Sequence, residues 1–403
     1  MRLLASLMKR FVKVGTLTIL DVEGKPHVFK GAQGPEVTIR LKDRKLYRSL
    51  FLNPELHAGE AYMDGMLTIE KGTIRDFLFL AELNGKNLRR HPLQSFLHRG
   101  LKGIRKFHQR NDAKAARTHV HHHYDLSNEL YKLFLDKDLN YSCAYFTKPD
   151  DTIETAQQNK LRHIAAKLDL KPGQRVLDIG CGWGGMALYL AAAADVEVTG
   201  VTLSTEQHAL ATERAKERGL DKRVRFELMD YRDVEGTFDR VVSVGMFEHV
   251  GIVHYDEYFG KIRDLLKPDG VALLHSIGRK GGPGTTGAWM RKYIFPGGYS
   301  PALSEALASV ERSKLWVTDI EILRLHYAKT LRAWEERFQA NRPRITALMD
   351  ERFCRMWEFY LIVSELSFSH GSHMVFQMQL TKDRHALPIT RDYMGKVEAG
   401  LKG

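Results

Sequence analysis

The sequence predicts an α/β fold, with a doubly wound, mostly parallel sheet, a helical insertion late in the chain and a smaller α/β domain ahead of it. The first observation is an apolar strand, Val176–Ile179, that ends in a glycine-dense turn, Gly180–Gly185, and leads at once into a helix-forming stretch, Met186–Ala194. The second is that further apolar strands alternate with helices of about ten residues, as in consecutive βαβ units. The glycines allow the backbone to approach a ligand more closely than any Cβ would permit.

Apolar runs and turn residues predict the other elements of the sheet region. A helix over Thr155–Leu168 leads through the turn Lys171-Pro172-Gly173 into the first strand. After the glycine turn and its helix, the pattern predicts in order strand Val196–Val201, helix Glu206–Arg218, strands Val224–Leu228 and Arg240–Val244, the turn Lys267–Gly270 and strand Val271–Ser276. A helix over Arg352–Leu366 and a last strand over Met374–Leu380 follow.

Residues 279–340 interrupt this rhythm. The stretch Gly281–Gly284 precedes aromatic residues that we place on helices, and these are Trp289, Tyr293, Trp316, Tyr327 and Trp334. In this architecture an insertion after the fifth strand lies above the carboxyl ends of the strands, where ligands bind. We therefore expect a lid over an apolar substrate, although most of these aromatic side chains also suit an ordinary core.

The N-terminal residues 15–83 predict a small α/β domain. Alternating strands are expected over Thr16–Leu20 and Glu36–Leu41, and a helix over Thr73–Asn84. The turn signals Gly24-Lys25-Pro26 and Asn53-Pro54 separate these elements.

The positive charge of the chain is concentrated near its start. The first 118 residues hold 23 Lys and Arg against 11 Asp and Glu, whereas the rest of the chain holds 38 of each. Between Lys86 and Arg117 ten basic side chains accompany a single acid, Asp112. Such a stretch attracts polyanions, either nucleic acid or an anionic membrane surface.

Part of this basic stretch has the pattern of an amphipathic helix. Apolar residues recur every three or four positions from Leu93 to Phe107, with Arg and Lys between them. A helix of this kind can lie in a lipid interface, or it can be a linker that packs on its own protein. A nucleic-acid interface is less favoured, because few aromatic side chains are arranged for stacking on bases.

Composition indicates a cytosolic protein without a membrane span. No apolar run approaches the roughly 20 residues that cross a bilayer. Lys9, Arg10 and Lys13 interrupt the apolar start, so we expect no export signal. The three cysteines, Cys143, Cys181 and Cys354, are widely spaced, which is typical of free thiols in a reducing compartment.

A histidine-rich segment, His119–His123, invites a metal interpretation. Adjacent histidines of an extended chain point apart, and metal sites usually have Cys or carboxylate partners at suitable spacing. We therefore predict no metal, and interpret this segment as an entry segment that covers the active site.

The glycine turn itself resembles a cofactor loop. Its spacing, Gly180-x-Gly182-x-Gly184, is shorter than the dinucleotide pattern and lacks the Lys-Ser/Thr of a P-loop, so a nucleoside triphosphate is not expected. Together with Asp178 it is similar to the S-adenosylmethionine loop of class I (Rossmann-like) methyltransferases. The alternative is a purely structural glycine turn, since a fold does not by itself give a function.

Several motifs in order along the chain strengthen this resemblance. They are His123–Asn128, Tyr141–Tyr145, Asp178–Gly185, Gly200–Ser204, Gly245–Gly251 and Leu274–Gly278, with Gly59–Gly65 nearer the start. The set resembles the cyclopropane-fatty-acyl-phospholipid synthases and the related mycolic acid cyclopropane synthases. The resemblance implies a small N-terminal lipid- or substrate-associated domain at 1–92, a basic amphipathic linker helix at 93–118, and a catalytic domain at 119–403 with a lid at about 279–340.

The resemblance also implies a reaction: the methyl of S-adenosylmethionine is transferred to a cis double bond of a phospholipid acyl chain. The resulting cation must lose a proton from the new methyl before the ring closes, which requires a base nearby. In this family that base is bicarbonate. Carried over by motif, the residues that hold it here are Cys143, Glu248, His275, the backbone of Ile277, and Tyr327.

The cofactor residues implied in the same way lie on several loops. They are Tyr141, Ser142, Asp178, Gly180, Gly182, Gly184, Thr202, Leu203, Gln207, Asp230, Tyr231 and Arg232. Class I methyltransferases usually end the second strand with an acid for the ribose hydroxyls, and this chain departs from that pattern. We therefore expect Thr202 and Gln207 to make the polar contacts there, and Asp230 to meet the adenine edge.

Each catalytic candidate has an alternative. Cys143 could be a nucleophile, but a covalent intermediate gains nothing in methyl transfer to an alkene. Glu248 could form a structural ion pair and His275 could be a satisfied core histidine. A carboxylate beside an anion requires a proton on one of them or a positive charge on His275, so we predict a raised pKa for Glu248.

Three functions are compared. The leading one is a peripheral membrane enzyme on the inner face of the cell membrane, recruited by anionic head groups. The family resemblance further implies a homodimer. The second uses the same cofactor and lipid but leaves a methyl- or methylene-branched chain. The third, a nucleic-acid-binding protein, depends on the stretch from Lys86 to Arg117 alone, and we expect no nucleic-acid partner.

Overall fold

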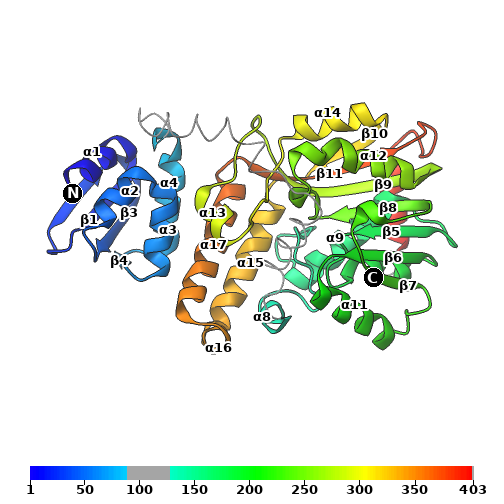
Figure 1. Cartoon of the computed structure of the whole chain (residues 1–403), viewed down its shortest axis with the longest axis horizontal. Coiled ribbons are helices and arrows are strands. Elements are labelled where there is room, and N and C mark those ends of the chain that lie inside the picture. The colour runs from blue at the N-terminus through cyan, green and yellow to red at the C-terminus, as the bar shows by residue number, and fades with distance from the viewer. Residues whose placement is uncertain (89–127, 402–403) are drawn as a thin grey trace. The chain divides into compact units, whose positions relative to one another are not determined.

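The computed structural model of the chain describes residues 1–88 and 128–401, and Cα proximity divides them into two compact units (Figure 1). The first unit comprises residues 1–88, Thr285–Pro296 and Leu331–Ser372, and the second comprises the other described residues. The boundaries of these units differ from the predicted domain boundaries. Thr285–Pro296 and Leu331–Ser372, which the sequence places in the catalytic domain, group with the N-terminal residues. The predicted linker helix and the histidine-rich segment lie outside the described residues.

A seven-stranded sheet organises the second unit, with strand order β10-β11-β9-β8-β5-β6-β7. The five strands from β9 to β7 are parallel to their neighbours, whereas β11 runs antiparallel to both β9 and β10. The mostly parallel α/β fold is thus confirmed. The strands are β5 Arg175–Ile179, β6 Glu197–Thr202, β7 Val224–Leu228, β8 Phe238–Val244, β9 Leu266–Arg279, β10 Trp316–Ile322 and β11 His373–Thr381.

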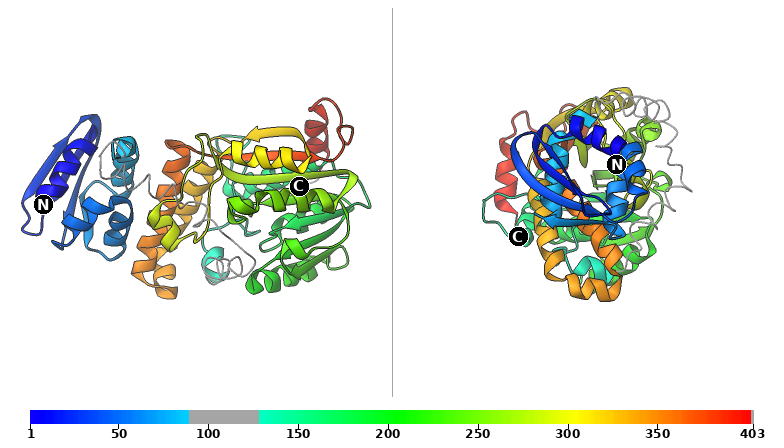
Figure 2. Two further views of the ribbon diagram at one scale, coloured as in Figure 1. Left: turned by 45° about the horizontal axis from the view of Figure 1, so that its top comes forward. Right: turned by 90° about the vertical axis from the view of Figure 1, so that its left-hand side faces the viewer.

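Helices cover both faces of this sheet (Figure 2). Those of the second unit are α8 Asn128–Lys132, α9 Ile153–Leu168, α10 Gly185–Ala193, α11 Thr205–Glu217, α12 Tyr255–Leu265, α14 Leu303–Ser313 and α18 Asp392–Gly400, with short 3₁₀ turns η1 Tyr231–Asp233, η2 Phe247–His249 and η3 Ile252–His254. The side chain of Thr152 caps the first turn of α9 by accepting a hydrogen bond from the Thr155 amide at 3.2 Å, and Ser204 caps α11 in the same way.

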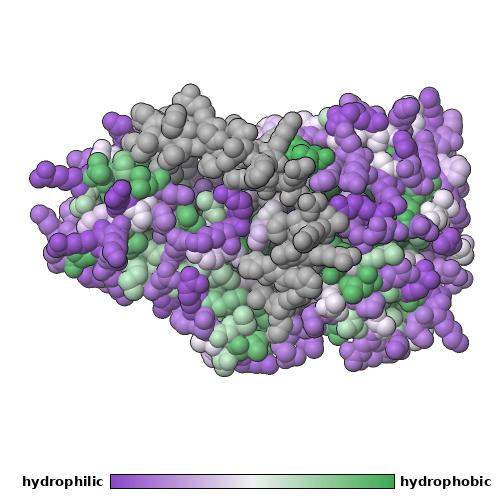
Figure 3. Space-filling view, in the orientation of Figure 1, coloured by the Kyte–Doolittle hydropathy of each residue, from purple (hydrophilic) through white to green (hydrophobic). Residues whose placement is uncertain are grey.

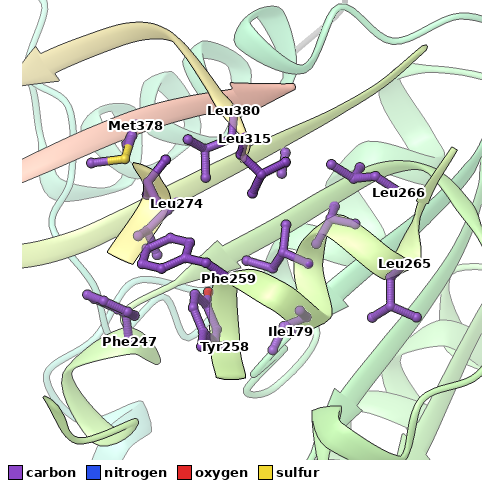
Figure 4. Close-up of a cluster of buried hydrophobic side chains, with 14 of the residues drawn as sticks. Ile179, Phe247, Tyr258, Phe259, Leu265, Leu266, Leu274, Leu315, Met378 and Leu380 are labelled. Atoms are coloured by element: carbon purple, nitrogen blue, oxygen red, sulfur yellow. The ribbon is translucent and has the colours of Figure 1, made fainter. Parts of the chain in front are cut away.

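Successive residues of each central strand enter different cores. Leu274 packs with α12 and α14, whereas its neighbour Leu273 packs with α9 and α10. Figure 4 shows the first of these cores, in which Leu274 and Leu380 meet Phe259. Because both faces of the sheet are covered, the central strands are continuous apolar runs and do not alternate between apolar and polar residues. The sequence shows this pattern.

The strand order reverses direction between β5 and β8. From β5 the chain proceeds outward to β6 and β7 and then returns to the other side of β5. The loops that follow β5 and β8, Gly180–Gly184 and Gly245–Glu248, therefore lie side by side at the carboxyl ends of adjacent strands. Ligands of doubly wound sheets bind at such a switch point.

Residues Lys267–Gly270, predicted as a turn, fall within the bounds of β9 but pair with neither β8 nor β11. The register against β8 passes from Phe238–Leu266 to Arg240–Val271, so these four residues form a bulge. One sequence expectation for this unit was wrong. Trp316, predicted on a helix, begins β10 at the sheet edge. The segment 297–330 thus supplies α14 and an added strand, and not a purely helical lid.

The first unit contains a four-stranded sheet of order β2-β1-β3-β4, in which only the β1–β3 pair is parallel. The sequence predicted β1 and β3 but missed β2 and β4, which are short strands with exposed residues. The elements are α1 Arg2–Phe11, β1 Val14–Leu20, β2 Pro26–Lys30, β3 Ala32–Leu41, α2 Leu46–Leu52, α3 Pro54–Met63, β4 Leu67–Lys71, α4 Ile74–Leu88, α13 Ala288–Tyr293, α15 His326–Ala340 (from Leu331 onward), α16 Arg342–Leu348 and α17 Glu351–Ser369.

Buried aromatic and ionic contacts hold the helices of this unit together. Trp289 of α13 packs on Phe359 of α17 with ring centroids 4.6 Å apart, and its indole ring would collide with any Cβ at Gly59. Arg75 of α4 pairs with Glu335 of α15 at 3.1 Å. The aromatic residues of the predicted insertion are therefore largely core residues here.

The surface carries hydrophobic side chains in small groups among hydrophilic ones (Figure 3). Exposed large side chains include Leu3, Val28, Leu325 and Ile389, which belong to separate elements and loops. Within residues 1–88 and 128–401, no helix combines the length and apolar character needed to cross a membrane.

Truncation of Leu380 tests the α12–α14 core. This side chain is fully buried on β11, so L380A should lower the free energy of unfolding by about 2–5 kcal/mol, because it loses apolar contact and leaves a cavity. The same change at Leu325, which is 56% exposed, should cost less than about 0.5 kcal/mol. Urea denaturation of both variants makes the comparison, and equal losses would contradict this core.

Candidate active site

A cavity opens at the switch point of the second unit. It is bordered by the loops after β5, β6, β7 and β8 and by the segment that precedes α9. Every residue predicted to contact the cofactor, except Gly184, lines this cavity. The sequence motifs, which are spread over about ninety positions from Tyr141 to Arg232, are therefore brought together in one place.

The glycine turn has two different roles. Gly180 and Gly182 have positive φ values of 77° and 54°, and the space beside Gly182 is open, as backbone that approaches a ligand requires. Gly184 instead begins α10, and a Cβ there would lie 2.6 Å from the ring of Phe226. We conclude that Gly184 serves helix–strand packing, which corrects its assignment as a cofactor contact.

Thr202 and Gln207 form a buried pair at the end of β6. The Thr202 hydroxyl and the Gln207 Oε1 atom are 2.9 Å apart, so the hydroxyl donates, and both residues line the cavity. Both groups are neutral, where other class I enzymes place an acid. Asp230 follows β7 and is held by Arg232 through hydrogen bonds of 2.8 Å and 2.6 Å to its two carboxylate oxygens.

Two side chains of α9 shape the opposite wall. Gln157 Nε2 donates to the backbone oxygens of Asn140 and Ser142 at 3.2 Å and 3.0 Å. One turn later, Lys160 Nζ donates to Asn140 Oδ1 and Ser142 Oγ, both at 3.0 Å. These bonds hold the segment that presents Tyr141 and Ser142 to the cavity.

Lys160 is a buried cation between acidic and polar groups. It is 1% exposed, and burial lowers its pKa to about 8. Its charge acts on Asp178, Cys143 and His275, so it is near both the cofactor cavity and the predicted catalytic residues. Burial raises the pKa of Asp178 to about 7, and its Oδ2 atom has no hydrogen-bond partner among the described residues.

Glu248 lies on η2, directly after β8. Its neighbour Phe247 is fully buried against Tyr255 and Tyr258, with ring centroids 4.3 Å and 5.1 Å apart, and this packing fixes the short helical turn (Figure 4). Glu248 Oε1 then accepts a hydrogen bond of 2.6 Å from the amide of Ile277 on β9.

The Glu248 carboxyl is poised to exchange a proton near neutral pH. Its Oε2 atom is buried without a hydrogen-bond partner in the part of the chain that the structure describes. Burial raises the pKa of the group to about 7, and the hydrogen bond from Ile277 only partly opposes this effect. The raised pKa predicted for Glu248 is therefore confirmed.

His275 is neutral. It lies on β9, two residues before Ile277, and is 2% exposed. Burial lowers its pKa to about 3, with the charges of Lys160 and Lys167 acting in the same direction. A lowered pKa disfavours a positive charge on His275, which was one of the options left open by the sequence.

A hydrogen bond between neighbouring residues links the segment that carries Cys143 to the helix that carries Tyr327. The amide of Ala144 donates a hydrogen bond of 3.0 Å to the hydroxyl of Thr330, one turn after Tyr327 on α15. Both Cys143 and Tyr327 are buried. Burial raises the pKa of the Cys143 thiol, which keeps it protonated and argues against a nucleophilic role.

Comparisons with known proteins show the family of the chain. The model of the family "Mycolic acid cyclopropane synthetase" matches residues 111–378. The chain belongs to this family. It is an S-adenosylmethionine-dependent methyltransferase.

Individual relatives extend the similarity beyond the matched range. The cyclopropane-fatty-acyl-phospholipid synthase of Escherichia coli K12 is 43% identical over 325 residues, covering 80% of this chain and 82% of its own. A probable fatty acid methyltransferase of Pseudomonas putida is 38% identical and covers 89% of this chain and 92% of its own. A cyclopropane synthase structure from Mycobacterium tuberculosis has a TM-score of 0.63 at 33% identity, covering 66% of this chain and 97% of its own.

The residues present fit the cofactor of this family. The open space at Gly182, the unpartnered oxygen of Asp178 and the side chain of Gln207 line one cavity, so polar groups are available for the amino-acid, ribose and adenine parts of the ligand. No group of three or more His, Cys, Asp or Glu side chains within 1–88 and 128–401 is placed to hold a metal ion. His119–His123 lies outside these residues.

The sequence did not reveal the role of α9. Gln157, Lys160 and Lys167 are buried polar residues on a helix that we read only as a lead into the first strand. Their spacing of three and seven residues places them on one face of the helix among apolar neighbours. This pattern of polar residues on an apolar face is the sequence signal that could have indicated their role. Gln377 on β11, which contacts His275, carried no motif that we recognised.

Replacement of Lys160 tests the wall of the cavity. K160M removes both hydrogen bonds to the Asn140–Ser142 segment, so S-adenosylhomocysteine should bind at least about tenfold more weakly by calorimetry. The matched control is K148M, at an exposed position, which should keep the affinity of the unchanged chain. Unchanged affinity in K160M, with the fold intact by circular dichroism, would contradict the role of Lys160.

The raised pKa of Glu248 has a consequence for stability. In the unfolded chain the Glu248 carboxyl ionises with its ordinary pKa of 4.5, whereas in the folded chain its pKa is about 7. Above pH 7 folding therefore buries a carboxylate, which lowers the free energy of unfolding. This loss of stability disappears as the pH falls toward 4.5. E248Q should therefore be about 1–3 kcal/mol more stable than the unchanged chain at pH 8, and equally stable near pH 4.5. Urea titrations at both pH values make the test, with the exposed E311Q as control. A pH-independent difference would refute the assignment.

Proposed function

We propose that this enzyme transfers the methyl of S-adenosylmethionine to a cis double bond of a phospholipid acyl chain and closes a cyclopropane ring, with bicarbonate as the base. The observation that carries the proposal is the buried Glu248 carboxyl, held by the amide of Ile277, two residues after His275 on β9. The loop after β8 that carries Glu248 also contributes Gly245, Met246 and His249 to the cofactor cavity. Its lipid-acting relatives in Escherichia coli and Pseudomonas putida support a lipid acceptor.

The chemistry places two demands on the protein. S-adenosylmethionine supplies an electrophilic methyl, whose carbon bonds to one alkene carbon as its bond to sulfur breaks. The cationic chain then gives up a proton from that methyl to a base and closes the ring. The protein must hold the reacting carbons in line, exclude water, and place a base that is not itself alkylated.

The candidate residues suit an anionic base. Glu248 in its protonated form, neutral His275, the thiol of Cys143 and the hydroxyl of Tyr327 are all hydrogen-bond donors, and a bicarbonate ion accepts such bonds. The unpartnered Oε2 atom of Glu248 is buried, so in its protonated form this group can donate to a small anion that is shielded from water. Bicarbonate bound there would supply the proton acceptor that ring closure requires.

A second function differs only in the last step. Loss of a proton from a chain carbon would leave a methyl-branched alkene, whereas a hydride shift followed by loss of a proton from the transferred methyl would leave a methylene branch. The name of the Pseudomonas putida relative, a probable fatty acid methyltransferase, is compatible with both outcomes. The candidate residues from Cys143 to Tyr327 support a base near the transferred methyl, and product analysis distinguishes the ring from the methylene branch.

We further propose that the enzyme acts at the inner face of the cell membrane as a peripheral protein and a homodimer. The first 118 positions hold 23 basic and 11 acidic residues, and this net positive charge supports attraction to anionic head groups. Vesicle flotation with and without anionic lipid tests the attraction, and loss of binding at high salt is the expected result.

Product analysis tests the reaction. The purified enzyme is incubated with S-adenosylmethionine, bicarbonate and vesicles of an unsaturated phospholipid, and the fatty esters are examined by proton NMR. Loss of olefinic protons with new upfield ring protons is the expected result. Retained olefinic signals with one added carbon would establish the branching reaction, whereas no lipid product, together with salt-sensitive RNA binding, would favour the nucleic-acid alternative.

Glu248 should be needed for this product. E248Q keeps an acceptor for the Ile277 amide but cannot exchange a proton, so ring formation should fall by about 10²–10⁴-fold. E311Q, exposed and remote in sequence, should retain full activity. Ring formation in E248Q within a few-fold of the unchanged enzyme would exclude Glu248 from the reaction.

A further inference from the structure

Three strands of the second unit carry a row of polar side chains beneath α9. Glu321 on β10 is opposite Gln377 on β11, and Gln377 is opposite His275 on β9. Lys167 of α9 reaches this row with an Nζ that is hydrogen-bonded to Gln377 Oε1 at 2.8 Å and to the Glu321 carboxylate. His275, Gln377 and Lys167 are each at most 2% exposed, so water does not compete for these bonds.

The charge of Lys167 decides which way the Gln377 amide faces. Burial alone would raise the pKa of Glu321, but hydrogen bonds and charges from His163 and Lys167 lower it strongly, so the pair with Lys167 is ionic. An ammonium group only donates hydrogen bonds, and its partner on Gln377 must therefore be the carbonyl oxygen Oε1. The amide nitrogen of Gln377 consequently faces His275.

The amide then decides the protonation of the imidazole. Gln377 Nε2 lies 3.2 Å from His275 Nδ1. Since the amide nitrogen donates, Nδ1 must accept, and the single proton of a neutral imidazole is on Nε2. A proton added at Nδ1 would face the amide hydrogens, and turning the amide would bring those hydrogens against the Lys167 ammonium.

We propose that Gln377, oriented by Lys167, is a positioning residue that locks His275 in its neutral Nε2–H form, so that His275 donates a hydrogen bond and cannot take up a proton. The structural part stands on the hydrogen-bond network, and its catalytic meaning rests on the proposed function. In that reaction the proton released from the transferred methyl goes to the bound anion, and His275 serves only to hold that anion.

The charged groups around His275 are consistent with the lock. Lys160 and Lys167 face it from α9, as does His163, and each disfavours an added proton, whereas Glu321 acts in the opposite sense. His163 itself is hydrogen-bonded to Glu321 at 2.7 Å and to Glu398 of α18 at 3.2 Å. These two carboxylates favour a positive charge on His163, which then lies beside the polar row.

The experiment is a long-range ¹⁵N–¹H correlation spectrum of the full chain labelled at histidine, with the His275 signals assigned by their loss in H275Q. The pattern distinguishes Nδ1–H, Nε2–H and imidazolium without any substrate. For the unchanged protein we expect the Nε2–H form throughout pH 6–9. A Nδ1–H form or an imidazolium in this range would overturn the proposal.

Variants of Gln377 complete the test. Q377E places an acceptor at Nδ1, so His275 should change to the Nδ1–H form or to imidazolium, and Q377M should allow a mixture of the two neutral forms. The matched controls are Q379E and Q379M, two residues along β11 on the same buried face, where Gln379 contacts the Lys167 backbone and Tyr393 but not His275. These should keep the Nε2–H form, and a change of form in them, or no change in Q377E and Q377M, would refute the lock.

Kinetics separate this inference from the proposed function. If the lock serves ring closure, Q377E should lower kcat at least about tenfold and leave KM for S-adenosylmethionine within about twofold. An altered His275 form with unchanged kcat would overturn the catalytic part. Absence of any lipid product from the unchanged enzyme would reject the proposed function, while the spectrum would still decide the tautomer.

Discussion

The structure of the site depends on two buried lysines on one face of α9. Lys160 and Lys167 are seven residues apart, which is two helical turns, and each is 1% exposed. Removing an ammonium group from water costs several kcal/mol unless it gains close partners, so the segments around each lysine must present acceptors. Lys160 finds them on the wall of the cofactor cavity, and Lys167 finds them on the strand row beside His275.

This constraint connects the two halves of the chemistry. A single helix fixes the segment that presents Tyr141 and Ser142 and also the amide that faces His275. A shift of α9 would therefore disturb the wall of the cofactor cavity and the surroundings of His275 together. The opposite face of the sheet supports the site as well. There Phe247 packs against α12, and this packing fixes the backbone position of the next residue, Glu248.

The acidic groups of the site share one physical cause. Asp178 and Glu248 are both buried, each has an oxygen without a hydrogen-bond partner within the described part of the chain, and burial raises the pKa of each to about 7. Structural carboxylates in the same unit, such as Asp239 beside Lys267, have a lowered pKa because they gain a cation. Burial also raises the pKa of Asp136, but both oxygens of that carboxyl accept hydrogen bonds within the chain, whereas Asp178 and Glu248 each keep one oxygen without a partner among the described residues.

Sequence alone predicted the parts of the fold and site that follow local rules. The glycine turn, the strand rhythm and the neutral pair Thr202–Gln207 were recognisable because they are contiguous or regularly spaced. The turn signal at Lys267–Gly270 corresponds to a bulge inside β9, where pairing with β8 skips these four residues. Gln377 was missed because its role exists only through cross-strand register with His275, more than a hundred residues away.

The division into units escaped prediction for a similar reason. Segments Thr285–Pro296 and Leu331–Ser372 have helical patterns that fit either unit. Their attachment is decided by individual contacts, such as Trp289 on Gly59, that composition does not reveal.

The measurement that tests the account most directly follows hydrogen from the transferred methyl. With S-adenosylmethionine carrying a CD3 group, ring closure assisted by a base near that carbon must release one deuterium to water and keep two in an upfield ring methylene. The account predicts this result, and predicts that E248Q lowers the yield of this product by about 10²–10⁴-fold. A product that keeps all three deuterium atoms would contradict the claim that the buried site around Glu248 and His275 serves to remove that proton.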